Sequence, residues 1–180
     1  MKIFVFLADG FEEIEAIAAV DIFRRAEIEV QTVSITTEKT VIGAHNIPVL
    51  SESVFSEIDF PQECLLYLPG GMPGTKNLAA HKGLIKLIQK QADAQKHIAA
   101  ICAAPSILGQ LGLLHNKEAI CYPGFENQLS GAILSEHKIA ISNNILTAKG
   151  AGVAIEFALK IVETIKGKDT AISIEKAIQL

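Results

Sequence analysis

A single cysteine stands where a short apolar run meets a predicted helix. Cys102 follows the run HIAAI and precedes Ala103-Ala104-Pro105, so small residues flank it. A nucleophile elbow needs small residues there, because the turn is tight and neighbouring backbone comes close. A thiol at a helix N-terminus also faces free backbone N–H groups, which favour the thiolate. We therefore predict a nucleophilic Cys102. The alternative is a buried cysteine that acts as a small apolar side chain.

Two glycines follow another apolar run and could bring backbone close to the same ligand. In Pro69-Gly70-Gly71, the glycines let the chain turn freely after the predicted strand. The N–H groups of Gly71 and Ala103 would then face a developing oxyanion together. The alternative is a turn that only ends the strand. Neither GxGxxG nor GxxxxGK[ST] occurs in the chain, so we do not expect a nucleotide-binding loop.

The third segment whose residues could take part in catalysis is acidic and follows the first apolar run. Glu12 and Glu13 suit the first turn of a helix, where carboxylates stabilise the helix dipole. Glu15 lies on the flank of the predicted apolar face, so its carboxyl can point inwards. A buried carboxyl has a raised pKa and can keep its proton at neutral pH. We expect Glu15 to donate a hydrogen bond to the Cys102 thiolate and to move protons.

The remaining cysteines and the histidines show no pattern of a metal or disulfide site. Cys64 begins a predicted strand, and Cys121 lies in an irregular apolar patch. We expect both to be core residues, although Cys121 as a second oxidisable thiol stays open. The chain has three cysteines and no CxxC pair, so we predict free thiols and no metal site.

Apolar runs alternate with amphipathic stretches, as in repeated β-α-β units. The predicted strands are Lys2–Ala8, Glu29–Ile35, Cys64–Leu68, His97–Ile101, Lys138–Ser142 and Asn144–Ala148. The predicted helices are Ile14–Ala26, Gly83–Ala94, Ala103–Leu111 and Ala151–Lys166. We also expect a hairpin within Thr40–Leu50, an irregular segment over 116–131, and a short helix or a loose arm from Asp169. This order predicts a mostly parallel sheet with helices on both faces.

The same pattern predicts which edge of the sheet holds the site and which face of the first helix is buried. Ligands of open α/β sheets collect at the carboxyl ends of the strands, where all three chemical segments begin. In the first helix, Ile14, Ile17, Ala18 and Ile22 have helical spacing and are expected to face the core.

Length and composition indicate one globular domain over residues 1–180. Apolar residues make up 49% and charged residues 20%, which argues against disorder. The net charge of −4 argues against a nucleic-acid partner. No run of roughly 18 apolar residues occurs, so no membrane span is expected. The run Ile3–Ala8 is too short for a signal-peptide core, so we expect a cytoplasmic protein with reduced cysteines.

Four segments together resemble the ThiJ/PfpI superfamily: AAICAAP, LPGG, IFVFLADGFEEIEA and TAKGAGVAIEFALKIVE. The similarity is greatest to the branch that holds the Parkinson-disease-associated deglycase and its bacterial chaperone-like relatives. The resemblance implies a flavodoxin-like sandwich, related to class I glutamine amidotransferases, that is usually a homodimer and needs no cofactor. It implies that Cys102 is the reactive cysteine, Glu15 the buried carboxyl beside it, and Gly71 and Ala103 the oxyanion donors.

The resemblance also implies a substrate class. Relatives act on small dicarbonyls such as methylglyoxal, or on early glycation adducts. The alternative is a redox-sensing stress chaperone that uses oxidation of the same Cys102. A cysteine peptidase or amidase would need a histidine after the elbow helix. The matching residue here is Tyr122, whose phenol, with a pKa of about 10, is a poor base.

Three further residues are candidates for contact with substrate: Gly70, Tyr122 and His45. His45 matches the position of an arginine that the branch offers from the neighbouring subunit, and it is a weaker anchor for an acid. Arg24 or Arg25 is the alternative anchor.

Overall fold

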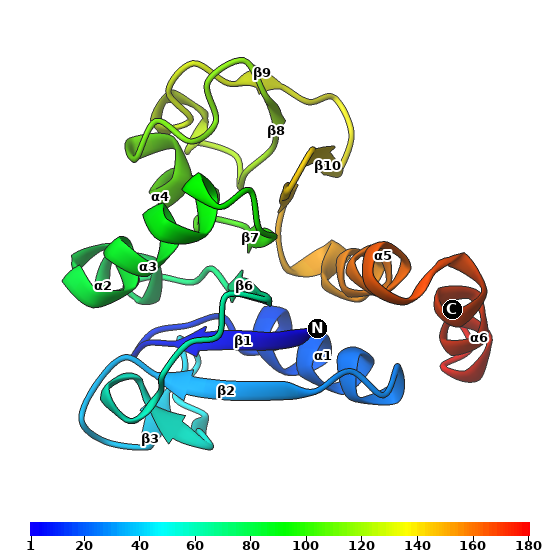
Figure 1. Cartoon of the computed structure of the whole chain (residues 1–180), viewed down its shortest axis with the longest axis horizontal. Helices are drawn as coiled ribbons and strands as arrows, with labels where there is room; N and C mark the ends of the chain where they lie inside the picture. Colours follow the sequence, from blue (N-terminus) through cyan, green and yellow to red (C-terminus); the bar gives the residue numbers. More distant parts are fainter.

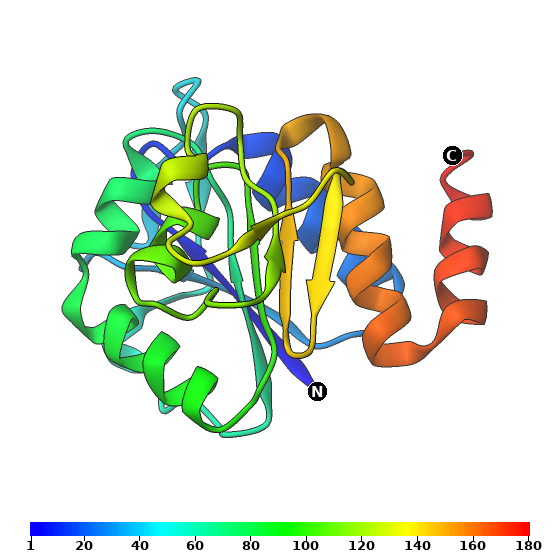
Figure 2. The same cartoon turned by 90° about the horizontal axis from the view of Figure 1, so that it is seen from above.

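The chain forms a seven-stranded sheet with helices on both faces (Figures 1 and 2), in a computed structural model that describes all 180 residues. The strand order is β10-β11-β7-β6-β1-β2-β5. These strands are β1 (Lys2–Leu7), β2 (Val30–Ser34), β5 (Ser53–Val54), β6 (Cys64–Leu68), β7 (Ile98–Ile101), β10 (Ile139–Ser142) and β11 (Ile145–Ala148). Only β10 is antiparallel to its neighbour. The predicted mostly parallel sheet is therefore confirmed.

Helices cover the two faces of the sheet in separate groups. On one face, α1 (Glu13–Arg25) and α5 (Ala154–Lys166) bury a cluster of 28 residues. On the other face, α2 (Gly74–Ala80), α3 (Lys82–Asp93) and α4 (Pro105–Gln110) bury a cluster of 21 residues. The last helix, α6 (Lys168–Ala177), packs outside α5 (Figure 2). None of these helices has the length and apolar composition needed to cross a bilayer.

Short elements complete the fold. They are the antiparallel hairpin of β3 (Thr40–Ile42) and β4 (Pro48–Leu50), the parallel pair of β8 (Glu118–Ala119) and β9 (Ile133–Leu134), and 3-10 turns at Phe55–Glu57, Glu126–Gln128 and Ala151–Val153. The hairpin is confirmed, and the chain from Asp169 is helical. The sequence pattern predicts no helix between Gly71 and Gly83, but α2 lies there. Such a short helix is stabilised by packing rather than by propensity, and its Leu78 is fully buried.

The inward face of α1 differs from the prediction. Ile14 and Ile17 are 57% and 41% exposed, so the expectation that they face the core is wrong. Ala16, Ala19 and Phe23 are buried instead. The small alanines let α1 approach the sheet and α5 closely, and the buried stripe is therefore displaced along the helix surface. Because the buried stripe is displaced in this way, the third residue of the helix, Glu15, is fully buried.

Candidate active site

Three loops meet at the carboxyl edge of the sheet, after β1, β6 and β7. The Glu12 N–H donates to the Gly70 carbonyl at 3.0 Å, and the Gly70 N–H donates to Glu15 Oε2 at 2.7 Å. A Cβ atom placed on Gly70 would lie 2.6 Å from the Cβ of Cys102 and 2.8 Å from Glu15 Oε2. Only a glycine at position 70 leaves room for the cysteine and the carboxyl to stand this close together.

Cys102 occupies the turn between β7 and α4 in a left-handed backbone conformation. Its φ is 65°, which costs about 1–2 kcal/mol for a residue with a side chain. Two hydrogen bonds hold it there: its N–H donates to the Ala148 carbonyl at 2.9 Å, and its carbonyl accepts from the Tyr122 N–H at 2.7 Å. Strain maintained by surrounding bonds is characteristic of functional sites. Cys102 is only partly buried, whereas Cys64 and Cys121 are buried free thiols, as expected.

Two backbone N–H groups face the Cys102 sulfur. They belong to Gly71 and Ala103, and hydrogen bonds from both lower the pKa of the thiol. Gly71 has a φ of 90°, and a Cβ atom there would collide with the backbone nitrogen of Glu12. Because α4 begins only at Pro105, the Ala103 N–H belongs to the turn and not to the helix. The donors at the sulfur therefore come from two loops, after β6 and after β7, rather than from a helix terminus.

Glu15 has a fully buried side chain, and the residue is contacted from three other segments of the chain. Its Oε2 accepts from the Gly70 N–H, the Ala151 N–H also faces the carboxyl, and its main-chain carbonyl accepts from the Tyr67 hydroxyl at 2.9 Å. The other carboxyl oxygen, Oε1, is buried without a hydrogen-bond partner. Burial raises the pKa of Glu15 to about 7, against the opposing interactions with Cys102 and Gly70. This carboxyl therefore holds a proton far more readily than an exposed one.

The Cys102 thiol and the Glu15 carboxyl titrate as a coupled pair. Burial, and then the negative charge of Glu15, raise the pKa of Cys102 to about 12. The expected lowering of the thiol pKa is therefore wrong for a cysteine that faces an ionised Glu15, because the carboxylate repels a second negative charge. Between the two pKa values, about 7 and about 12, the pair retains one proton. The thiolate forms when that proton resides on Glu15.

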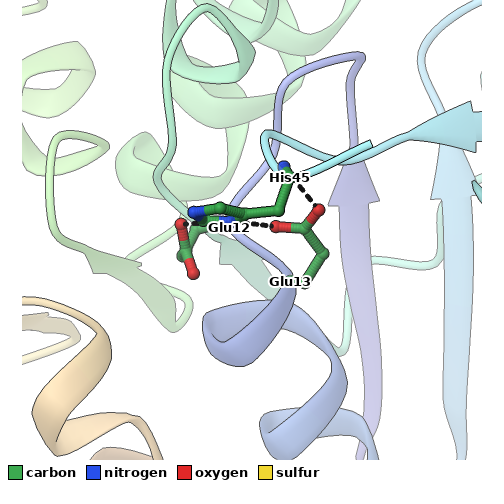
Figure 3. Close-up of side chains that lie close together, drawn as sticks. All are labelled: Glu12, Glu13 and His45. Carbon is green, nitrogen blue, oxygen red and sulfur yellow. Dashed lines mark hydrogen bonds and ion pairs between the residues drawn. The ribbon is translucent and has the colours of Figure 1, made fainter. Parts of the chain in front are cut away.

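Glu13 and His45 form a second polar contact at this edge, shown in Figure 3. Glu13 Oε1 accepts from the His45 main-chain N–H at 2.7 Å, and Oε2 lies 2.8 Å from His45 Nδ1. Glu12 Oε2 lies 3.7 Å from the same ring nitrogen. We call this contact the Glu13–His45 clasp. Glu13 lies in the first turn of α1, where the sequence places it, and its side chain is also buried.

The clasp has its own electrostatics. Burial alone would raise the pKa of Glu13, but hydrogen bonds from the His45 ring and backbone outweigh it and lower that pKa. The hydrogen bond to Glu13 and the charges of both glutamates raise the pKa of His45. Glu12, Glu13 and His45 each offer a ligand atom within 4.8 Å of one another. Both carboxyl oxygens of Glu13 contact His45, one through the main-chain N–H and the other through the ring.

The side chains of His45 and Tyr122, the other residues predicted to contact substrate, make their contacts away from the Cys102 sulfur. The side chain of His45 is 67% exposed, and its polar contacts are with the glutamates rather than with Cys102. Tyr122 is half exposed, and its ring packs on Gly150, where a Cβ atom would lie 3.3 Å from Tyr122 Cδ2. It is the backbone of Tyr122, not its phenol, that bonds to the elbow.

The two arginines offered as alternative anchors are engaged elsewhere. Arg24 pairs with Glu52 at 3.1 Å, and Arg25 pairs with Asp21 at 2.7 Å. Both lie in the last turn of α1, whereas Glu15 lies in its first turn. Neither arginine therefore takes part in the site within this chain.

Sequence reasoning missed two groups that hold Glu15. The Tyr67 hydroxyl comes from the strand β6 itself, and the Ala151 N–H comes from the turn after β11. For the turn, a signal was present: Gly150-Ala151-Gly152 interrupts the pattern between a strand and a helix. For Tyr67 there was none, because a tyrosine within a buried strand looks like an ordinary core residue.

The sequence is similar to those of known proteins over most of its length. Residues 1–164 match the DJ-1/PfpI family. Protein DJ-1 homolog A of Arabidopsis thaliana is 35% identical over 98% of this chain; the chain spans 45% of its length and 40% of that of the related homolog B. Glutathione-independent glyoxalase DJR-1.2 of Caenorhabditis elegans is 31% identical over 94% of this chain and 90% of its own.

The fold comparison agrees. The structure of oxidized DJ-1 from Toxoplasma gondii superposes with a TM-score of 0.93 at 32% identity, over 99% of this chain and 97% of that one. The expected flavodoxin-like fold is therefore confirmed. With the family match over most of its length, the chain belongs to the DJ-1/PfpI family, in its DJ-1 branch.

Proposed function

We propose that the protein is a cofactor-free glyoxalase that converts methylglyoxal-type dicarbonyls to hydroxyacids, with early glycation adducts as related substrates. The observation that carries this proposal is the pairing of Cys102 with the buried Glu15 across Gly70. The family includes enzymes, and the relatives named glutathione-independent glyoxalase support the same chemistry.

The first half of the reaction uses the shared proton. The Cys102 sulfur attacks the aldehyde carbon, a C–S bond forms, and the carbonyl electron pair moves to oxygen. The N–H groups of Gly71 and Ala103 stabilise the oxyanion, and the proton held by Glu15 moves to that oxygen. The product is a hemithioacetal, and Glu15 is left ionised as a base.

The second half moves a proton between two carbons. The Glu15 carboxylate removes the proton from the former aldehyde carbon, and an enediol forms. The proton then goes to the former ketone carbon, and the hydroxyl proton of the former aldehyde carbon passes to the neighbouring oxygen, which gives a thioester. Water hydrolyses this thioester to the hydroxyacid and the free thiol. The aldehyde carbon is oxidised and the ketone carbon is reduced by the same two electrons. The reaction therefore balances without an external oxidant or reductant.

Methylglyoxal turnover tests the proposal. The purified protein should convert methylglyoxal to lactate, and Cys102→Ser should abolish the conversion while the protein remains folded by thermal melting. Cys64→Ala is the matched control, because Cys64 is a buried thiol at the far end of β6 and should retain turnover. Absence of lactate formation by the wild-type protein would contradict the proposed reaction.

A second assay separates glycation adducts from the free dicarbonyl. Early adducts release methylglyoxal reversibly, so loss of adduct is assigned to the enzyme only if it persists when a scavenger removes free methylglyoxal. Persistence would extend the proposal to adducts, and loss of the effect would restrict the substrates to free dicarbonyls.

The redox-sensing chaperone is the second candidate, favoured by the partial exposure of Cys102. Peroxide would convert the thiolate to a sulfenic acid and then a sulfinic acid, with water as the product of each step. Mass spectrometry after graded peroxide, run beside the lactate assay, separates the two. Stoichiometric oxidation of Cys102 without turnover would favour the sensor. Peptidase activity is not proposed, because Tyr122 stands where its base would be needed.

We further propose a homodimer formed through exposed apolar residues around the Glu13–His45 clasp. Ile14 and Ile17 on α1, with Ile47 and Leu50 in the hairpin, are all exposed large hydrophobic residues. Such patches characterise protein interfaces. Light scattering should give a dimer for the wild type and a monomer for Ile14→Glu/Ile17→Glu. The control Ile133→Glu, exposed on β9, should remain dimeric.

We place the protein in the cytoplasm as one domain. Reducing conditions there keep all three cysteines as the free thiols described above. A single domain should unfold in one cooperative transition. Two separate transitions of the wild-type protein would contradict the single domain.

A further inference from the structure

A cavity of about 430 Å³ lies beside the candidate active site, lined by Tyr122, Pro123, Lys138, Lys149 and residues 150–153. Two of its lining residues contact the reaction centre through their backbone N–H groups. The Tyr122 N–H binds the Cys102 carbonyl, and the Ala151 N–H faces the Glu15 carboxyl. A molecule in this cavity is therefore next to the backbone segments that hold both reacting groups.

Two lysines give the cavity a positive charge. The antiparallel register pairs Ile139 with Ala148, and the Lys149 N–H donates to the Lys138 carbonyl at 2.9 Å, which continues that register. Lys138 and Lys149 therefore stand opposite each other at the edge of the sheet formed by β10. Like charges in directly opposed positions destabilise a strand pair.

No ion pair within the chain neutralises these two charges. Neither lysine takes part in an ion pair, although eight ion pairs occur elsewhere in the protein. No acidic side chain lines the cavity, in a protein whose net charge is −4. An anion bound between the lysines would relieve their mutual repulsion.

The rest of the lining suits the carbon chain of a small molecule. The Tyr122 ring, Pro123 and Val153 provide apolar surface, and Gly150 and Gly152 leave space beside the backbone. Pockets with mainly apolar walls and a few charged groups orient a ligand by its charged end. One end of this cavity would hold an anion, and the side towards the elbow would hold uncharged carbon.

We propose that this cavity binds the anionic end of an α-oxoaldehyde, a carboxylate or a phosphate, and directs its aldehyde to Cys102. The inference rests on the proposed glyoxalase reaction and names the substrate class that the reaction prefers. Methylglyoxal, which is neutral, would make no use of the two lysines.

Alkylation of Cys102 tests the inference without any need for turnover. Iodoacetate and iodoacetamide have nearly the same size and both form a C–S bond as iodide leaves, but only iodoacetate carries a negative charge. The rate ratio of iodoacetate to iodoacetamide at Cys102, measured by peptide mass spectrometry, should fall roughly three- to ten-fold in Lys138→Ala/Lys149→Ala. The ratio also cancels any change in the thiol pKa.

A matched control removes two charges elsewhere. Lys86→Ala/Lys90→Ala takes two exposed lysines from α3, which does not line the cavity, and should leave the ratio unchanged. The wild-type preference for iodoacetate should also weaken as salt rises, because screening shortens the reach of the lysines. An equal ratio in the wild type and in Lys138→Ala/Lys149→Ala overturns the inference.

Turnover of two anionic substrates shows whether the cavity prefers a carboxylate or a phosphate. It also separates this inference from the proposed function. The probes are γ,δ-dioxovalerate, which carries a carboxylate, and phosphohydroxypyruvaldehyde, each compared with methylglyoxal by kcat/KM. Removing the lysines should lower the anionic-to-neutral ratio for the preferred probe by a similar factor. Turnover of methylglyoxal with no lysine-dependent preference overturns only the inference. A lysine-dependent alkylation ratio without any turnover overturns only the proposed reaction.

Discussion

Glu13 and Glu15 stand two residues apart in the first turn of α1, and both side chains are buried. Their environments nevertheless shift the pKa of the two carboxyls in opposite directions. The hydrogen bonds of His45 lower the pKa of Glu13. Burial raises the pKa of Glu15 to about 7, because the interactions that stabilise its charge are too weak to offset desolvation. The comparison shows that the donors around a buried carboxyl decide whether it serves structure or proton transfer.

The largest expected effect separates the two carboxyls by activity. Glu15→Gln should lower methylglyoxal turnover by about 10²–10⁴-fold, the usual contribution of a proton-transferring group, because an amide cannot take up the proton. Glu13→Gln should retain turnover within a few-fold, since Glu13 does not face Cys102. Lactate formation by both purified variants checks this. Equal losses in the two variants would remove the distinction between the carboxyls.

The next effect separates the two carboxyls by the pH dependence of stability. The folded-state pKa of Glu15, about 7, lies above the ordinary value of 4.5, so the folded protein binds more protons between these values and loses stability as pH rises. Glutamine has no such loss. Glu15→Gln should therefore increase the free energy of unfolding by up to about 3 kcal/mol at pH 8 and change it little at pH 4.

Glu13→Gln should show the opposite sign. The pKa of Glu13 is lowered in the folded protein, so its ionised form adds stability above the unfolded value of 4.5 and loses it as pH falls through the folded pKa. The variant should be less stable than the wild type at pH 7, and the difference should fade in acid. Denaturant titrations at pH 4 and pH 8 measure both variants. The same sign for both would contradict the assignment.

A smaller effect compares the glycine beside each carboxyl. Gly70→Ala places a Cβ atom 2.6 Å from the Cβ of Cys102 and should cost about 1–3 kcal/mol of stability and most of the turnover. Gly43→Ala places a Cβ atom against the end of the Glu13 side chain and should weaken the clasp while turnover persists. Thermal melts and lactate formation check both. Turnover of Gly70→Ala at the wild-type rate would disprove the close packing.

The smallest expected effect concerns the partner in the clasp. His45→Ala removes the ring contact but keeps the main-chain N–H that binds Glu13 Oε1, so its melting temperature should fall less than that of Glu13→Gln. Because the pKa of His45 is raised in the folded protein, the difference from the wild type should be fully present below pH 6.5 and should vanish as pH rises through the folded pKa. A pH-independent difference would show that the ring acts by packing alone.

Much of the fold and the residues of the site follow from local patterns. Cys102 between small residues, the paired Gly70-Gly71 after a strand, and the run of buried strands are visible within a few residues of sequence. The hairpin at Thr40–Leu50 and the closing helix follow from the same kind of signal. The positions of these groups at one sheet edge then follow from the general rule for parallel sheets.

The misses have one physical origin, which is contact between distant segments. The isoleucines Ile14 and Ile17 have the spacing of a core face, but the smaller Ala16 and Ala19 fit the close approach to α5 and take that place. The thiol pKa depends on how near the first turn of α1 comes to the turn after β7. No local pattern contains that distance, and α2 depends on packing in the same way.

The central claim, that Cys102 and Glu15 share one proton, is tested most directly by the pH dependence of Cys102 alkylation by iodoacetamide, followed by peptide mass spectrometry. The account predicts that the rate in the wild-type protein rises with pH through about 7, as the pair loses its first proton, and that this step is absent in Glu15→Gln. A single step near the ordinary thiol value of about 8.5, identical in both proteins, would contradict the shared proton.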